Sequence, residues 1–213
     1  MAGVVRTMLC LCSGHSGESE AFLGASQWRV IRIDNNPALG SLPHTQTLDV
    51  LDWCDWIDTI PHPELIWASP PCQQFSFANR NRDPEEWDLS ILHAVMDIID
   101  YLKPKWWIVE NVRGAYVPFS KLLGPVTQRL GPFYLWGKFP HIACHVDWRG
   151  QLKQRLGHMI LDVPEGVGYW LFNGVRYEKW ESPQNAKIPV EISEELFHAV
   201  HNHRGLEEWC KNE

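Results

Sequence analysis

The chain has 213 residues, 45% of them hydrophobic, and a formal net charge of −7. This length and composition predict one compact domain with a hydrophobic core, or one domain plus a small appendage. The negative charge argues against tight non-specific binding to DNA, which requires cations against the phosphates, but it leaves room for a local basic groove. No apolar run approaches the roughly 20 residues that span a bilayer.

Cysteine usage and the first residues indicate a cellular compartment. Residues 1–7 contain a single arginine and no long apolar run follows them, so no signal peptide is expected. The six cysteines are scattered and form no Cys-x-x-Cys pair. We therefore expect reduced thiols in a cytoplasmic protein, with no metal site. No residue pattern determines the oligomeric state, and a monomer is favoured.

A strand, a glycine turn and a helix are predicted first. Residues 8–12 form a short apolar run, residues 13–17 contain two glycines, and residues 18–23 suit a helix with acids in its first turn. This arrangement lets a ligand approach the backbone closely. A lone Gly-x-x-Gly is more often just a tight turn, so it does not identify a ligand site by itself.

The second and third strands are predicted to end in acids. Residues 28–33 alternate and are β-branched, and they lead to Asp34. An acid about 20 residues past such glycines is typical of a group that binds a ribose diol, although Asp34 also suits a helix N-cap. Residues 45–50 predict a third strand that ends near Asp49. Residues 52–58 suit either a short helix or a loop, and the sequence does not decide between them.

The fourth strand is predicted to lead into a cysteine. Residues 65–68 form a short apolar run, followed by two prolines and Cys72. A thiol at the carboxyl end of a central strand stands where open α/β sheets bind ligands, and the dipole of a following helix can lower its pKa. The alternative is a small buried thiol that only packs.

A long helix and a fifth strand follow. Residues 85–103 show helical spacing, with Asp83 as a possible cap and Pro104 as the end. The apolar positions of this helix are Leu89, Leu92, Val95, Met96, Ile99 and Leu102. Residues 106–109 then predict a buried strand that closes on Glu110. Two neighbouring strands therefore each end in a reactive side chain, although many glutamates at strand ends are simply solvated.

The remaining pattern is looser. A helix is predicted over residues 120–130, and strands over 132–137 and 157–161, which suit an antiparallel sheet edge. Residues 148–155 form the most basic stretch, which a solvated loop would also explain. A last helix is predicted over residues 191–203, with Ile192, Leu196, Phe197 and Val200 on one face.

These landmarks together resemble the DNA (cytosine-5)-methyltransferase family, in particular its short phage-type members. The matching residues are Ser13-Gly14-x-x-Gly17, Asp34, Asp49, Pro70-Pro71-Cys72-Gln73, Glu110-Asn111-Val112 and the segment 185–200, in the order of the family. Pro-Cys-Gln at the end of one strand, with Glu-Asn-Val at the end of the next, is a specific combination.

The resemblance implies an α/β fold of the Rossmann-like S-adenosylmethionine-dependent methyltransferase type, mostly parallel with an antiparallel strand near one edge. It divides the chain into a catalytic domain (1–161), a minimal target-recognition or connecting segment (162–184) and a C-terminal helix that packs back on the catalytic domain (185–213). The cofactor-binding residues that it implies are Ser13, Gly14, Gly17, Asp34, Asp49, Val50, Pro71 and Asn185.

The resemblance also implies a mechanism on double-stranded DNA. Attack of Cys72 on C6 of a flipped-out cytosine makes C5 nucleophilic, and a protonated Glu110 hydrogen-bonds ring N3. Arg155 closes a Gln-x-Lys-x-Arg segment that is similar to a Gln-x-Arg-x-Arg pattern of the family, and it is expected to contact the base or a phosphate. The implied DNA contacts are Arg80, Arg82, Arg113 and Lys153.

Two departures from the family pattern affect the expectations. Cys10-Leu11-Cys12 stands where the family has Asp-Leu-Phe, so the aromatic residue that stacks on adenine is missing, and Ser16 replaces a glycine. Residues 162–184 are far fewer than the roughly one hundred of a full recognition domain, a sizeable domain by any standard. We therefore expect a target of two or three base pairs, or recognition supplied by a partner.

Three other functions stay open. The acidic charge and small size suit a methyltransferase of free cytidine nucleotides, and a non-catalytic DNA- or cofactor-binding relative would keep the same fold. Methylation of an exocyclic amine would use Ser69-Pro70-Pro71, but Cys72 then stands in place of the required aromatic residue. By analogy with phage-type relatives, the protein would act in the cytoplasm of a bacterial host. It would protect viral DNA within restriction–modification or carry out a first step toward a more elaborate modified base.

Overall fold

A computed structural model of the chain describes residues 5–77, 79, 81, 83–144 and 188–203, together with the backbone of 169–172 and 175–178. Several predicted features lie outside these residues. They are Arg80, Arg82, Lys153, Arg155, Asn185, the basic stretch 148–155 and the strand predicted over 157–161.

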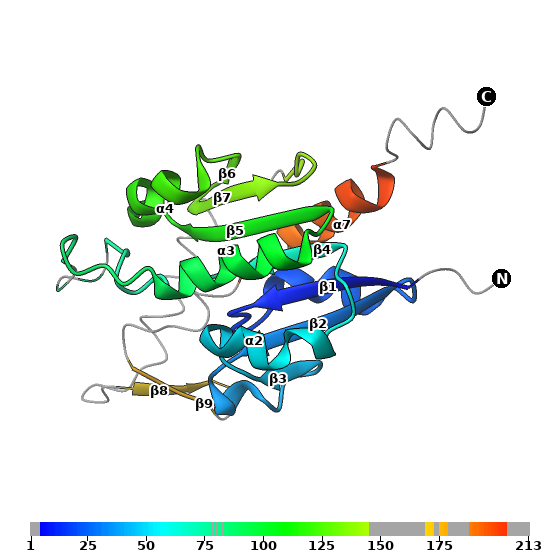
Figure 1. Ribbon diagram of the computed structural model, residues 1–213, viewed down its shortest axis with the longest axis horizontal. Coiled ribbons are helices and arrows are strands. Elements are labelled where there is room, and N and C mark those ends of the chain that lie inside the picture. The colour runs from blue at the N-terminus through cyan, green and yellow to red at the C-terminus, as the bar shows by residue number, and fades with distance from the viewer. Residues whose placement is uncertain are drawn as a thin grey trace.

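A seven-stranded mixed sheet forms the centre of the molecule (Figure 1). Its strands are β1 (Arg6–Leu11), β2 (Trp28–Asp34), β3 (Thr45–Thr47), β4 (Leu65–Ala68), β5 (Trp106–Val112), β6 (Gln128–Leu130) and β7 (Phe133–Lys138). The spatial order is β3-β2-β1-β4-β5-β7-β6. Strands β1 to β5 pair in parallel, whereas β7 runs antiparallel to both β5 and β6. The predicted fold class, a mostly parallel Rossmann-like α/β sheet with antiparallel strands at one edge, is confirmed.

Short and long helices connect the strands. They are η1 (Gly17–Ser19), α1 (Glu20–Leu23), η2 (Pro37–Leu39), η3 (Val50–Asp52), α2 (Trp53–Trp56), η4 (Ile57–Thr59), α3 (Ser90–Leu102), η5 (Arg113–Ala115), α4 (Tyr116–Leu123) and α7 (Val190–Asn202). Strands β8 (Tyr169–Phe172) and β9 (Val175–Glu178) form a separate antiparallel pair. None of the helices in the described ranges has the length and apolar character that crossing a membrane requires.

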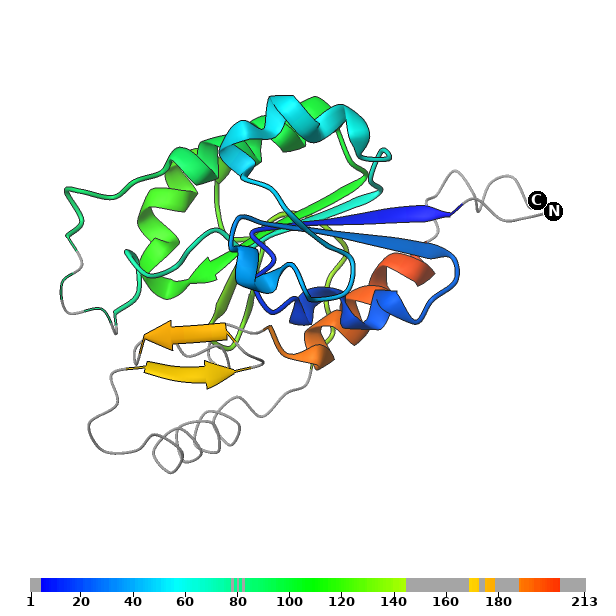
Figure 2. The same cartoon turned by 90° about the horizontal axis from the view of Figure 1, so that it is seen from below.

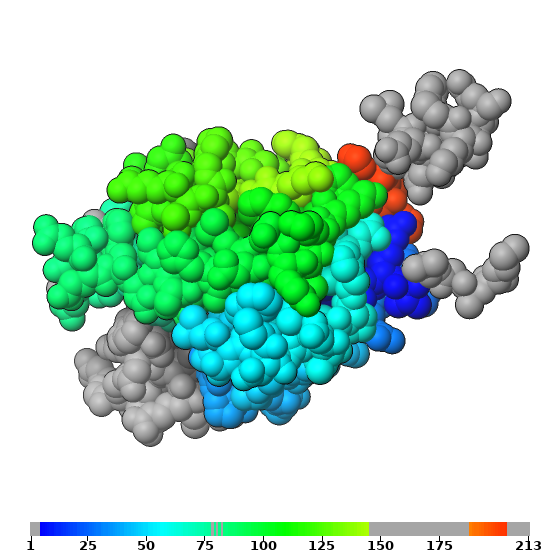
Figure 3. All heavy atoms as spheres, in the orientation of Figure 1, coloured from blue at the N-terminus to red at the C-terminus, as the bar shows by residue number. Residues whose placement is uncertain are grey.

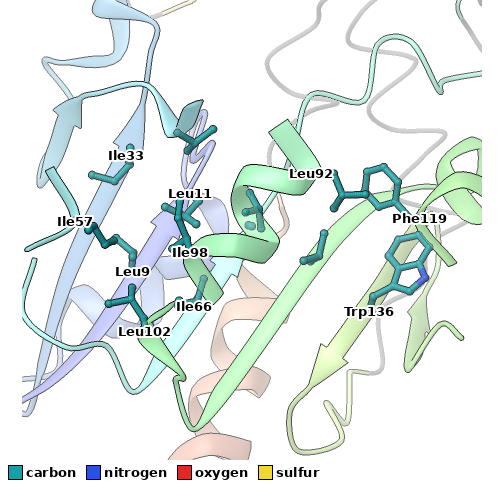
Figure 4. Packing of buried hydrophobic residues seen from close by; sticks show 14 of the residues in the cluster. Leu9, Leu11, Ile33, Ile57, Ile66, Leu92, Ile98, Leu102, Phe119 and Trp136 are labelled. Carbon is teal, nitrogen blue, oxygen red and sulfur yellow. The ribbon is translucent and has the colours of Figure 1, made fainter. Parts of the chain in front are cut away.

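One face of the sheet is covered by α2, α3 and α4. Leu9 and Leu11 of β1 point to this face, where they meet Ile98 and Leu102 of α3 (Figure 4). In the space-filling view, the atoms of the segments around α2 and α3 adjoin one another on this side of the molecule (Figure 3). Because residues of a strand alternate between faces, the other half of β1 serves a second core.

The opposite face is covered by α1 and α7, as the view from below shows (Figure 2). Phe22 of α1 contacts Phe197 of α7 edge to face, with ring centroids 5.3 Å apart. The backbone N–H of Ala21 donates to the hydroxyl of Ser193 at 3.1 Å. The predicted last helix is thus present, and it closes the face of the sheet on which the first helix lies.

Two predicted helices differ from the structure. The helix expected from residue 85 begins only at Ser90, because the side chain of Gln74 holds both backbone groups of Asp88 (2.6 and 2.8 Å) in a non-helical turn. The helix expected over residues 120–130 is wrong. Helix α4 ends where Gly124 takes a φ of +82°, and residues 128–130 pair with β7 instead. The undecided segment 52–58 is helical.

Candidate active site

The carboxyl ends of β4 and β5 bring together a thiol and a carboxyl group. Ala68, the last residue of β4, pairs with Val109 of β5, so Glu110 follows beside Ser69. Cys72 lies three residues beyond Ser69, at the same edge of the sheet. The two strands are adjacent, as the sequence predicted.

The Glu110 side chain is enclosed, with 8% of the residue exposed. Burial raises the pKa of its carboxyl group to about 7, because the ionised form loses hydration. A hydrogen bond with Ser69 lowers this pKa, and the charge of Glu18 raises it. Glu110 is therefore a carboxyl that still holds a proton near neutral pH, rather than a solvated strand end.

Cys72 sits in a tight turn, and it differs from the prediction in one respect. The backbone N–H groups of Phe75 and Ser76 both donate to the carbonyl oxygen of Cys72, at 3.0 and 2.9 Å. No helix begins directly after this turn, since α3 starts at Ser90. The expected lowering of the thiol pKa by a helix dipole is therefore wrong. Burial, followed by the charge of Glu110, raises the pKa of Cys72 to about 11.

Residues that follow Glu110 hold the segment 69–77, which we name the Cys72 loop. The amide of Asn111 donates to the carbonyl oxygen of Pro70 at 2.9 Å. Gly114 lies so close to the loop that an added Cβ would stand 1.8 Å from the carbonyl oxygen of Phe75. The role of Gly114 could not be predicted from the sequence, because a contact of this kind between distant residues leaves no local pattern.

Aromatic side chains pack against the buried side of the Cys72 loop. Phe75 is almost fully buried and contacts Phe119 of α4, with ring centroids 5.2 Å apart, and Trp87 at 5.7 Å. Phe77, by contrast, is 61% exposed, and Tyr116 at the start of α4 is 47% exposed. The Cys72 loop thus has one buried aromatic side chain, Phe75, and one exposed aromatic side chain, Phe77.

The turn that follows β1 and leads into η1, residues 12–17, is named the glycine turn. Cys12, Gly14 and Ser16 all have positive φ, at 51°, 48° and 59°. A Cβ on Gly14 would meet no described atom within 4 Å, so open space lies in front of this backbone. The hydroxyl of Ser13 is buried and has no hydrogen-bond partner among the described residues.

Acids from β2 and the end of β3 flank the glycine turn. The carboxylate of Asp34 accepts from the backbone N–H of Gly14 at 2.8 Å. Asp49 accepts from the backbone of Leu51 at 2.9 Å and from the side chain of Asn35 at 3.0 Å. The alternative role of Asp34 as a helix cap is wrong, because Asn36 caps η2. The charges of Asp34 and Asp49 both act on the Cys12 thiol and, after burial, raise its pKa further.

A buried arginine fastens the glycine turn from behind. Arg32 of β2 is 4% exposed, and its guanidinium donates to the hydroxyl of Ser19 (2.9 and 3.0 Å), the carbonyl oxygen of Ser16 (3.1 Å) and that of Pro43 (3.1 Å). In the sequence, Arg32 was only one residue of an alternating strand. Its inward position in a buried strand could have indicated a structural role, since a buried cation needs several acceptors.

Comparison with known proteins agrees with this geometry. The family described as C-5 cytosine-specific DNA methylase matches residues 49–122. A probable DNA (cytosine-5)-methyltransferase of Frog virus 3 (isolate Goorha) is 30% identical over 167 residues, which are 70% of this chain and 68% of the viral protein. The chain belongs to the DNA (cytosine-5)-methyltransferase family.

Other relatives of the family are similar over shorter stretches. The type II methyltransferase M.HgiGI of Herpetosiphon aurantiacus is 32% identical over 113 residues, 49% of this chain and 89% of that protein. Among solved structures, a DNMT2 mutant of Spodoptera frugiperda gives a TM-score of 0.43 at 18% identity, covering 67% of this chain and 52% of that one. The chain thus spans about half the length of that solved structure.

The cofactor of this methyltransferase family is S-adenosylmethionine, and the residues present fit it. The open space at Gly14 leaves the backbone accessible, and the buried Ser13 hydroxyl still lacks a partner among the described residues. Each carboxylate oxygen of Asp34 and Asp49 accepts one hydrogen bond and keeps a second lone pair. Polar acceptors and an open backbone suit a ligand with hydroxyl and amino groups.

The structure places the predicted residues in two groups. Cys72, Pro71 and Glu110 lie at the ends of β4 and β5, and Arg113 follows in η5 with an exposed side chain. The residues predicted for the cofactor, Ser13, Gly14, Gly17, Asp34, Asp49 and Val50, lie at the ends of β1, β2 and β3. The carboxyl ends of the parallel strands therefore carry both groups along one edge of the sheet.

Proposed function

We propose that this protein methylates C5 of a flipped-out cytosine in double-stranded DNA through a covalent adduct with Cys72. The observation that supports this most is the pairing of Cys72 with Glu110. They follow adjacent parallel strands, and the charge of Glu110 acts on the thiol of Cys72. A nucleophile and an acid at the carboxyl ends of adjacent strands can engage one pyrimidine ring.

The protonation states of the two groups are linked. With a pKa of about 11, the Cys72 thiol is ionised in only about one molecule in ten thousand at neutral pH. This raised pKa already includes the effect of a negative Glu110, which disfavours the thiolate because like charges repel. The reactive form therefore has a Cys72 thiolate beside a protonated Glu110. In the proposed reaction the sulfur bonds to C6, and Glu110 donates a hydrogen bond to N3, where electron density accumulates.

The glycine turn and its acids would hold the cofactor, which supplies a methyl group on a sulfonium. Gly14 leaves the backbone accessible and Gly17 follows it in the same turn, while Asp34 and Asp49 offer acceptors to hydroxyl and amino groups. Ser13, Val50, Pro71 and Asn185 complete the proposed set. After transfer, the C5 proton is lost to a base, the C6–S bond breaks and Cys72 is released.

DNA would approach over the exposed side of the Cys72 loop. Arg113, Phe77 and Tyr116 are exposed there. We assign phosphate or base contacts to Arg113 and to Arg80, Arg82, Lys153 and Arg155. The segment 162–184, which includes β8 and β9, would read a target of two or three base pairs, because it is much shorter than a separate recognition domain.

A covalent trap tests the proposal. The protein is incubated with S-adenosylmethionine and a duplex that contains 5-fluorocytosine, from which the C5 fluorine cannot leave as a proton does. Wild type should form a complex that survives denaturation, and Cys72→Ser should form none. Nucleoside mass spectrometry of DNA from expressing cells should detect 5-methylcytosine with wild type only. Full methylation by Cys72→Ser would end the proposed mechanism.

The net charge of −7 supports one alternative, a methyltransferase of free cytidine nucleotides. A small substrate needs no broad cationic surface, whereas duplex DNA does. The same methyl-transfer assay, run with duplex, single-stranded DNA and cytidine nucleotides, separates the two. Methylation of nucleotides with no activity on either form of DNA would replace the proposed substrate and leave the role of Cys72 intact.

A further inference from the structure

Glu18 is a buried carboxyl that the proposed mechanism does not use. It lies in η1, directly after the glycine turn, and only 2% of the residue is exposed. One of its carboxyl oxygens, Oε1, has no hydrogen-bond partner among the described residues. The sequence predicted Glu18 only as one of the acids in the first turn of a helix. An enclosed and incompletely bonded carboxyl is costly for the fold, so it calls for a functional explanation.

Glu18 and Glu110 occupy the same face of the sheet. Trp67 of β4 and Ile108 of β5 both point into the core under α1 and α7, so Ser69 and Glu110, each two residues on, point to that face as well. Cys10 of β1 belongs to the same core, and its thiol hydrogen-bonds the Glu18 carboxyl. Strands β1 and β5, which carry Cys10 and Glu110, lie two strand spacings apart, roughly 10 Å, with β4 between them. We take this spacing as the approximate separation of Glu18 from Glu110.

The groups around Glu18 are few. Burial raises its pKa to about 7, the charge of Arg32 and the Cys10 hydrogen bond lower it, and the charge of Glu20 raises it. Arg32 forms no ion pair with Glu18 in the described part of the chain, since its donors go to Ser16, Ser19 and Pro43. Helix α7 packs against η1, and its buried residues Ile192, Ser193 and Leu196 do not titrate, whereas the partly buried Glu191 in its first turn does.

The groups around Glu110 are equally few. Ser69 hydrogen-bonds its carboxyl, Glu18 raises its pKa, and Glu110 in turn acts on Cys72. On the β7 side it pairs with Leu135, which does not titrate. Within the described part of the chain, Glu18 is the acid whose charge raises the pKa of Glu110.

We propose that Glu18 is a positioning residue for the reaction, a second enclosed carboxyl that makes Glu110 keep its proton until the pyrimidine is bound. This rests on the proposed function, in which a protonated Glu110 donates to ring N3. The two carboxyls share an interior in which both cannot easily be ionised, so the pair retains a proton in the neutral range. When Glu110 is protonated, the charge that opposes the Cys72 thiolate is also removed.

The sign of the effect follows from repulsion between like charges. Replacing Glu18 by glutamine removes a negative charge, so Glu110 loses its proton at lower pH. For a full charge on Glu18 at about 10 Å and an effective dielectric constant near 20, the midpoint should fall by about one pH unit. The alkaline limb of the methylation rate should move to lower pH by the same amount, while a purely structural role of Glu18 would leave it in place.

The test is a carboxyl titration in protein without DNA or cofactor. Glutamate side chains are labelled with ¹³C, and the Glu110 resonance is assigned by its loss in Glu110→Gln. Its midpoint should fall in Glu18→Gln and stay in place in Glu20→Gln, a matched change two residues on that is only partly buried. An unchanged Glu110 midpoint in folded Glu18→Gln would overturn the proposal.

A reciprocal measurement covers the case in which Glu18→Gln does not fold. Coupling between two titrating groups is mutual, so Glu110→Gln must lower the midpoint of Glu18 by a similar amount. No shift of Glu18 in that variant would also overturn the proposal. Neither titration depends on catalysis. A protein that shows the coupling but fails to trap 5-fluorocytosine DNA would refute the proposed function alone.

Discussion

The glycine turn and the Cys72 loop end neighbouring strands, yet different forces hold them. The glycine turn is fastened by polar groups: the guanidinium of Arg32 binds Ser16 and Ser19, and Asp34 accepts from Gly14. The Cys72 loop is fastened mainly by packing and close backbone contact, through Phe75 and Gly114. A turn built on hydrogen bonds can exchange them for those of a polar ligand. A loop held by close packing, in contrast, fixes the position of the nucleophile that it carries.

Gly114→Ala should have the largest effect on the methyl-transfer rate, because it displaces the Cys72 loop. The new Cβ would stand 1.8 Å from the carbonyl oxygen of Phe75, so the backbone must move. Displacement of a reacting group by about 1 Å costs about 100-fold in rate, and overpacking costs about 1–3 kcal/mol of stability. Methyl-transfer rates and urea unfolding measure the two effects, while the affinity for S-adenosylmethionine should change little.

Gly24→Ala is the matched control. Gly24 follows α1, has a φ of −80°, and a Cβ there would meet no described atom within 4 Å. Its rate and stability should equal those of wild type. Equal losses in both variants would mean that the Cys72 loop is not held by the contact with Gly114.

Arg32→Met tests the polar half of the comparison. Methionine fills much of the volume but donates nothing. The carbonyl oxygens of Ser16 and Pro43 therefore lose the arginine donor, and that of Ser16 keeps only the donors of Ser19. We expect a loss of about 2–3 kcal/mol in the free energy of unfolding, together with weaker cofactor binding, measured by urea denaturation and calorimetry. Arg29→Met changes an exposed arginine of the same strand and should do neither. Loss of stability with unchanged cofactor affinity would mean that the hydrogen bonds of Arg32 stabilise the fold but do not shape the cofactor site.

The enclosed carboxyls should make stability depend on pH. The pKa of Glu18 and that of Glu110 are both raised to about 7 from 4.5, mainly by burial. The folded state therefore binds more protons between about pH 4.5 and 7, and stability is lost as pH rises through this window. Urea denaturation at pH 5.5 and 8.5 should show a drop in the free energy of unfolding, of which Glu110→Gln removes about 2 kcal/mol. Glu86→Gln, at an exposed position, should keep the full drop.

The sequence predicted the parts of this comparison that depend on local order. Short apolar runs located β1, β2, β4 and β5, and the order of motifs placed Cys72 and Glu110 on neighbouring strands. It failed where distant residues decide the outcome. Gln74 delays the start of α3, and pairing with β7 converts residues 128–130 into a strand.

The residues that hold the site were missed for the same reason. Gly114 matters only because Phe75 lies against it, and Arg32 only because the glycine turn folds over it. In the sequence, Glu18 is only an acid in the first turn of a predicted helix, whereas its burial depends on the packing of η1 against α1 and α7. A periodic pattern reports which face of an element is buried, but it does not report which polar group is buried with it.

Ser13→Ala should have the smallest effect on the fold and separates ligand binding from structure most clearly. The Ser13 hydroxyl is buried without a partner among the described residues, so its removal costs no hydrogen bond in the free protein. Urea denaturation should show stability equal to wild type or slightly higher. If the hydroxyl binds the cofactor, calorimetry should show affinity for S-adenosylmethionine weakened about fivefold, the equivalent of about 1 kcal/mol. Unchanged affinity would remove Ser13 from the cofactor site and leave Gly14, Asp34 and Asp49 to define it.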